Sequence, residues 1–192
     1  MKNCLLLYIY KNERDFNLSI LNEVYKDAIL FSTDRVLALD LSVLEWNDIF
    51  PAVTDFNTGQ FMITQFRYIE LLRFAMINGY EILDIKFYDK IEENTKNLIS
   101  EILGFTNSNT VNPIIKRKIF SLLKEELECD SIENNNEIAS IKIKLNSTEI
   151  EFYNCTKLKV NTNILDSDIL VLKKMLDSIS ESITPPKSPT AN

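Results

Sequence analysis

Residues 137–153 carry the strongest structural signal in the chain, because apolar and charged side chains alternate on both sides of Asn146 and Ser147. A two-residue turn at this point would join two antiparallel strands. The facing pairs would then be Lys144 with Glu149, Lys142 with Glu151, Ile143 with Ile150, and Ile141 with Phe152. Opposite charges share one face and apolar residues the other, and a shift of one residue would destroy both sets. The pattern therefore predicts a β-hairpin with one polar face.

Other strands are indicated by short apolar or alternating runs. Residues 5–10 form an apolar run without polar alternation, which is typical of a strand buried on both faces. Residues 36–41 are a candidate short strand within an ambiguous segment, 29–44. In a further strand, Leu83, Ile85 and Phe87 alternate with Asp84 and Lys86, and residues 157–160 are a candidate third strand beside the hairpin.

Helices are indicated by apolar residues that recur every three or four positions. The spacing predicts helices over residues 15–28, 61–77, 91–103 and 164–183, and a fifth that Pro113 opens. Gly79 is the expected left-handed cap of the second helix, and Gly104 is expected just past the end of the third. Residues 46–51 indicate a turn or short helix.

The order of these elements predicts an α+β fold, with a mixed α/β fold as the alternative. We expect a helix-rich core over residues 1–129, a polar linker or loop at 130–136, and a hairpin-plus-helix subdomain at 137–183. Residues 184–192 hold three prolines and are expected to be a disordered tail.

Residue types that are scarce in the chain exclude many kinds of active site. The 192 residues include no histidine and only three glycines. Catalytic triads and zinc sites built on histidine are therefore excluded, and widely spaced glycines rule out a Walker A or G-x-G-x-x-G loop. No cofactor and no metal site is predicted. The chemistry that remains would depend on carboxylates, lysine or tyrosine.

The best candidate for such chemistry combines Asp84 and Lys86 on the predicted strand with Glu70 on the preceding helix. It resembles the D/E-x-K half of metal-dependent nucleases, in which carboxylates hold magnesium and lysine orients water. About two such triplets would occur by chance in a chain this rich in acids and lysine. A solvent-facing pair on a strand explains the same residues and is favoured.

A second acidic pair, Asp166 and Asp168, stands where the last predicted helix begins. Paired carboxylates bind metal–nucleotide in some glycosyltransferases, but acids in a first helical turn also stabilise the helix dipole. Capping of the helix is the favoured interpretation.

Two other features indicate a protein partner. The last predicted helix carries a heptad-like apolar seam made of Leu165, Ile169, Leu172, Leu176 and Ile179. This seam either packs on the chain's own sheet, which is favoured, or binds a second subunit.

The helix opened by Pro113 has an unusual charge order. Lys116, Arg117 and Lys118 lie at its start, and Glu125, Glu126 and Glu128 lie toward its end. This is the reverse of what the helix dipole prefers. Solvated charge without a role is the simpler explanation, and contact with a partner is the alternative.

Taken together, these features favour a non-catalytic interaction protein, either an accessory subunit or an inhibitor or immunity-type protein for a basic partner. The alternative is the nuclease-like enzyme. A net charge of −7 disfavours direct contact with nucleic acid or an anionic membrane. The three cysteines form no C-x-x-C pair, which fits reduced thiols in the cytoplasm. The first apolar run is too short for a signal-peptide core or a membrane span.

Overall fold

A single antiparallel sheet is the frame of the computed structural model, which describes residues 2–9, 26–44, 58–107, 112–133, 137–160 and 164–181. Four helices lie in the described ranges, so the α+β class is confirmed. The elements are β1 Lys2–Ile9, β2 Ile29–Ser32, β3 Val36–Asp40, β4 Thr58–Gln60, α3 Gln65–Asn78, β5 Glu81–Phe87, α4 Glu93–Thr106, α5 Pro113–Glu133, β6 Ile138–Lys144, β7 Glu149–Tyr153, β8 Lys157–Val160 and α6 Asp166–Glu181.

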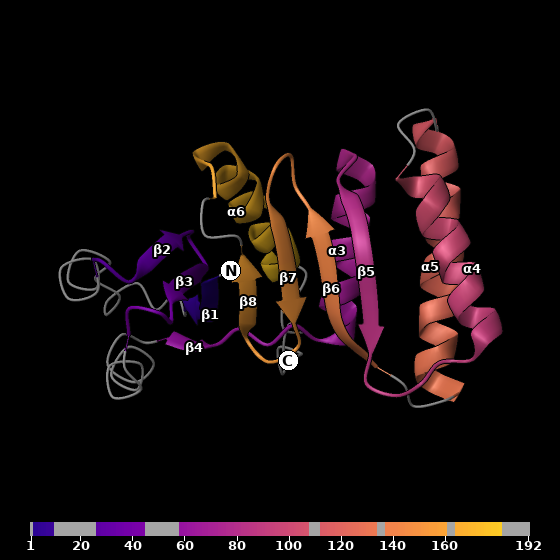
Figure 1. The fold of residues 1–192 in the computed structure, drawn as a ribbon, viewed down its shortest axis with the longest axis horizontal. Helices are drawn as coiled ribbons and strands as arrows, with labels where there is room; N and C mark the ends of the chain where they lie inside the picture. Colours follow the sequence, from indigo (N-terminus) through magenta and orange to yellow (C-terminus); the bar gives the residue numbers. More distant parts are fainter. Residues whose placement is uncertain are drawn as a thin grey trace, which may run out of the picture.

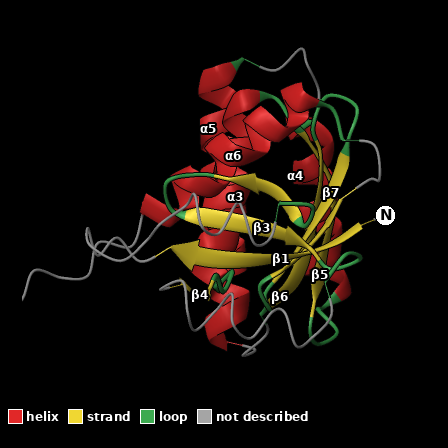
Figure 2. Cartoon of the chain, turned by 90° about the vertical axis from the view of Figure 1, so that its left-hand side faces the viewer, coloured by secondary structure: helices red, strands yellow, loops and turns green. Residues whose placement is uncertain are grey.

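The strands lie in the order β2-β3-β1-β8-β7-β6-β5, and β4 pairs with β1 beyond the end of β8. Every pairing is antiparallel. The strands β6–β8, which belong to the expected hairpin-plus-helix subdomain, lie between β1 and β5 in this one sheet (Figure 1). Figure 2 shows β1, β3 and β4 side by side at the other end of the molecule.

Strand β1 is buried on both faces, as its apolar run predicts. Cys4 and Leu6 belong to the main core between the sheet and the helices. Leu7 and Ile9 point to the other face, where they pack in a second apolar cluster that includes Leu37 and Leu39 of β3. The ambiguous segment 29–44 supplies β2 and β3, so its predicted short strand is confirmed.

All four predicted pairs of the β6–β7 hairpin are present in the sheet. The register was predictable because it depends on residues close together in sequence, and a shift of one residue would turn apolar residues such as Ile150 to the polar face. The third strand, β8, pairs with β7 as expected.

The predicted face of β5 is wrong at Leu83. The pairing with β6 shifts between Ile82 and Asp84, so that Leu83 is the extra residue of a bulge. Ile82 consequently turns toward the core with Ile85, while Leu83 is exposed. Simple alternation cannot anticipate a bulge, because the bulge depends on the partner strand.

Helices α6 and α3 lie on one face of the sheet, and α5 and α4 lie beside α3, beyond the β5 edge of the sheet (Figure 1). Helix α6 packs over β2 and β3, and α3 packs over β5 and β6. Helix α5 contacts α3, and α4 contacts α5. The pair α4–α5 is therefore the part of the helical layer farthest from the sheet's centre.

Helix α3 begins at Gln65, four residues later than predicted. The Thr64 hydroxyl accepts the N–H of Arg67 and caps the helix, while Phe61 and Ile63 enter the core in non-helical backbone. Its predicted end is confirmed, because Gly79 has a φ of 76° and donates its N–H to the carbonyl of Ala75.

Two other helix ends differ from the prediction. Gly104 lies inside α4, which ends at Thr106 instead. The amide of Asn107 accepts the N–H of Ile82 at 3.0 Å and donates to its carbonyl at 2.8 Å, so this helix end is fixed to β5. Helix α5 continues to Glu133 and thus includes the first part of the expected linker, 130–136.

The predictions for residues 15–25, 46–51 and 184–192 lie outside the described residues. Within the part of the chain that the structure describes, no helix combines the length and the apolar character needed to cross a membrane.

Candidate functional site

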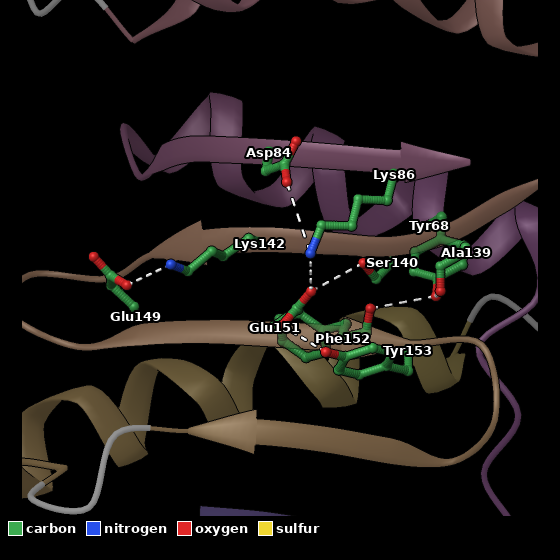
Figure 3. A network of polar contacts seen from close by, with 10 residues as sticks. All are labelled: Tyr68, Asp84, Lys86, Ala139, Ser140, Lys142, Glu149, Glu151, Phe152 and Tyr153. Atoms are coloured by element: carbon green, nitrogen blue, oxygen red, sulfur yellow. Dashed lines mark hydrogen bonds and ion pairs between the residues drawn. The ribbon is translucent and has the colours of Figure 1, made fainter. Parts of the chain in front are cut away.

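The sheet face away from the helices carries a network of charged and polar side chains from β5, β6 and β7 (Figure 3). At its centre Glu151 is buried, as is Ser140, whereas Asp84 and Lys86 are open to solvent. Its oxygens accept hydrogen bonds from the hydroxyl of Tyr153 at 2.6 Å, from Lys86 Nζ at 2.9 Å and from the Ser140 hydroxyl at 3.1 Å. Three strands thus contribute donors to one carboxylate.

The electrostatics of this network hold Glu151 in its charged form. Burial works to raise the pKa of Glu151, but the hydrogen bonds from Tyr153, Lys86 and Ser140 outweigh it and the pKa is lowered. The same hydrogen bond to Glu151 raises the pKa of Lys86. A carboxylate held ionised by three donors is a poor general acid and a weakened base. The arrangement is that of a structural ion-pair network.

Ion pairs on this face do not follow the facing pairs of the hairpin. Lys142 Nζ lies 2.6 Å from Glu149, the residue that faces Lys144 in the hairpin. Lys144 Nζ lies 3.7 Å from Glu81 on β5. Glu151, which faces Lys142, is paired with Lys86 at 2.9 Å. Long side chains reach diagonal neighbours readily, so register does not determine the ionic partner.

The structure brings together two of the three residues of the nuclease-like hypothesis. Lys86 Nζ lies 3.9 Å from Asp84, on the open face. Glu70 lies on α3, which packs against the opposite face of the sheet, and forms an ion pair with Arg73. The acidic residue that does pair closely with Lys86 is Glu151, which the sequence pattern placed opposite Lys142.

Among the described residues, no group of three or more Asp, Glu, Cys or His side chains is placed to hold a metal ion. Cys4 is fully buried in the core, and burial raises the pKa of its thiol to about 12. Such a thiol is almost wholly protonated near neutral pH and is a poor nucleophile.

The first turn of α6 contains a buried carboxylate that connects the helix to the β6–β7 turn. Asp168 is fully buried and accepts hydrogen bonds from Asn146 Nδ2 at 2.8 Å and from the Thr148 hydroxyl at 2.6 Å. The Ser147 hydroxyl donates to it as well, at 3.1 Å. Burial works to raise the pKa of Asp168, but these hydrogen bonds lower it overall. Asp168 is therefore an anchor between elements, beyond the helix-dipole role favoured from sequence.

The seam of α6 packs within the molecule. Leu172, Leu176 and Ile179 are fully buried in the main core, and Ile169 is partly buried against it. Leu165 is exposed. Three of the predicted contact residues are thus occupied by the chain's own core and are closed to a partner in this fold.

The basic cluster of α5 lies at the molecular surface. Arg117 and Lys118 are exposed, and Lys116 is half-buried. The sequence did not predict that several apolar side chains of α4 and α5 would be exposed. Exposed large hydrophobics on α4 and α5 are Leu98, Phe105, Ile114, Ile115 and Leu122. We call these five residues the outer apolar patch.

A signal for this patch is present in the sequence. Leu98 and Phe105 are seven residues apart, as are Ile115 and Leu122, so each pair shares one helix face. The sequence does not show which face is covered, because Ile99 and Ile102 of α4 and Leu123 of α5 have equally helical spacing and are buried.

A polar depression of about 450 Å³ lies between the end of α3 and the β6–β7 turn. It is lined by Asn78, Asn107 and Asn146, among others. The amide groups of these three side chains donate to Phe74, Ile82 and Asp168, respectively. Their amide donors therefore serve the fold, and the depression is not assigned as a ligand site.

Comparison of the chain with protein-family models, with curated proteins and with solved structures finds no match.

Proposed function

We propose that this chain is a non-catalytic protein that binds another protein through α4 and α5, as an accessory subunit of a complex in the cytoplasm. The observation that carries the proposal is the outer apolar patch on two adjacent helices at the periphery of the fold. Phe105 is 61% exposed, Ile114 65% and Leu122 59%. Single exposed apolar residues are common, whereas a concentration of them marks a contact surface.

The energetics favour covering this patch. Full burial of a leucine, isoleucine or phenylalanine side chain contributes about 1.5–3 kcal/mol. A residue that is half-exposed in the free chain still has apolar area to bury when a partner binds. A few such residues can therefore form the apolar centre of an interface. No catalytic group is needed for this role.

An inhibitor or immunity-type role for a basic partner is the second form of the same proposal. It is supported by the net charge of −7, which would accelerate encounter with a cationic surface. The two forms differ in salt dependence. A subunit held by the outer apolar patch keeps its partner as the salt concentration rises. An inhibitor guided by charge has an association rate that falls as the salt concentration rises.

Affinity purification of the full chain from its native host, with mass spectrometry, tests the proposal. The variant Leu98→Ser with Phe105→Ser removes two patch residues from α4. Its matched control is Val43→Ser with Leu170→Ser, two apolar residues that are 53% and 55% exposed elsewhere. We expect a stoichiometric partner with the wild type and the control, and at least a tenfold lower yield with the patch variant. A partner that is retained equally by the patch variant would refute this assignment.

A further inference from the structure

The charges of α5 are arranged in two blocks around one exposed apolar residue. Arg117 and Lys118 precede Leu122, and Glu125 and Glu128 follow it. All five side chains are exposed. The order runs against the sense of the helix dipole, but both blocks lie inside the terminal turns of α5, where the dipole acts on them only weakly.

Within the described part of the chain, three of these four charges form no ion pair. No ion pair there joins Arg117 or Lys118 to an acid of the same molecule, and Glu128 pairs only with Lys124 of its own helix, at 3.6 Å. Exposed charges of this kind gain their full value only when a partner brings the opposite charge close.

We propose that α5 binds α5 of a second copy of this chain, antiparallel and centred near Leu122. This inference rests on the proposed function and names the partner at the α5 half of the patch. Reversal of one helix places the basic block of each copy against the acidic block of the other. The arrangement is self-complementary, as a two-fold interface requires.

The spacing along the helix fits this centre. Lys118 is four residues before Leu122 and Glu126 is four after it, which at 1.5 Å per residue is about 6 Å on either side. Glu125 is within one residue of the same position, so Lys118 of one copy would lie opposite Glu125 and Glu126 of the other. The two Leu122 side chains would meet at the centre.

The exposed face of α5 also has the right periodicity. Ile115, Lys118, Leu122 and Glu125 are spaced by three, four and three residues, which places them along one stripe. A parallel pairing of the same stripe would bring Lys118 against Lys118 and Glu125 against Glu125. The charges therefore select the antiparallel arrangement.

Charge reversal gives a direct test in the full chain, with mass measured by sedimentation velocity or by size-exclusion chromatography with light scattering. The wild type is expected to be a dimer at low salt. Lys118→Glu alone and Glu125→Lys alone place like charges opposite each other twice, and each should weaken self-association at least tenfold. An equimolar mixture of the two variants should restore a dimer, because position 118 of each chain then faces a position 125 of opposite sign in the other chain.

Both positions are exposed, so each variant should still fold and keep the circular dichroism spectrum of the wild type. Lys96→Glu on α4 is the matched control, an exposed lysine outside the two blocks, and should not change the mass.

A wild-type chain that stays monomeric up to several hundred micromolar, or a dimer that neither reversal weakens, would overturn the inference. A monomer that still loses a heterologous partner on Leu98→Ser with Phe105→Ser would leave the proposed function standing. Failure of the second-copy inference and failure of the proposed function are thus distinguishable.

Discussion

Thr156 adopts a backbone conformation that suits glycine. Its φ is 53°, and it is the only non-glycine residue with positive φ in the described ranges. The residue lies in the loop between β7 and β8, and its carbonyl accepts the N–H of Leu6 in β1 at 2.7 Å. A β-branched residue with such a φ is strained by about 1–3 kcal/mol. The contact with the central strand holds the loop in this conformation.

We therefore expect Thr156→Gly to stabilise the protein by about 1 kcal/mol, since the strain is relieved while glycine's greater freedom in the unfolded chain offsets part of the gain. Urea unfolding followed by circular dichroism measures the change. Cys155→Gly, in the same loop without positive φ, is the control and should lower stability. A loss of stability with Thr156→Gly would show that the buried threonine side chain contributes more than the strain costs.

The charge of Glu151 should make the stability of the protein depend on pH in the acid range. Its pKa in the folded protein lies below the ordinary glutamate value of 4.5. Its contribution to stability is therefore complete above about pH 4.5 and is lost as the pH falls through the lowered pKa.

Glu151→Gln removes the charge and keeps the shape, so the difference in unfolding free energy between wild type and variant should shrink as the pH falls from neutral to about 3. Denaturant unfolding at several pH values measures it. Glu149→Gln, on the same strand and more exposed, should alter the pH dependence much less. An unchanged difference across this range would contradict the role given to the three donors.

At the level of elements, Asp168 joins α6 to the β6–β7 turn, which lies about twenty residues earlier in the chain. The carboxylate is fully buried and is satisfied by donors from the turn. Removal would leave Asn146 and Thr148 without their acceptor.

We expect Asp168→Ala to destabilise the protein by about 2–4 kcal/mol, because hydrogen bonds to a charged group are lost and the buried Thr148 hydroxyl is left without its acceptor. Asp166→Ala is a matched control, since this acid lies in the same first turn and is exposed. Its smaller effect should reflect the helix dipole alone. Equal effects in urea unfolding would show that Asp168 acts through the dipole and that the turn contributes little.

The elements also show what sequence could predict. The hairpin register and the Gly79 cap depend on neighbours within a few residues, and both are confirmed. The bulge at Leu83 and the acceptor role of Asp168 depend on strands and turns distant in sequence. Local patterns carry no information on such partners.

The candidate contact surface illustrates the same limit. The α6 seam has the better apolar spacing, yet Leu172, Leu176 and Ile179 fill the core. The outer apolar patch has similar spacing on α4 and α5 and lies outside. The two surfaces differ in where their helices lie. Helix α6 packs directly on the sheet, whereas α4 and α5 pack on other helices, and this arrangement depends on the whole fold.

At the scale of the whole molecule, the two faces of the sheet differ in what covers them. One face is covered by α3 and α6. Helices α5 and α4 continue this helical side outward and carry the outer apolar patch. On the other face, β5–β7 carry charges that are largely satisfied by each other. Binding is therefore expected at the helical side, and the paired charges of the open face make it the weaker candidate surface.

Hydrogen–deuterium exchange of the full chain, free at low concentration and bound to its partner, tests this most directly. Slower exchange on binding should be concentrated in α4 and α5, residues 93–106 and 113–133, since burial of the patch reduces opening of these helices. Slower exchange confined to β5–β7 or to α6, with α4 and α5 unchanged, would contradict the account.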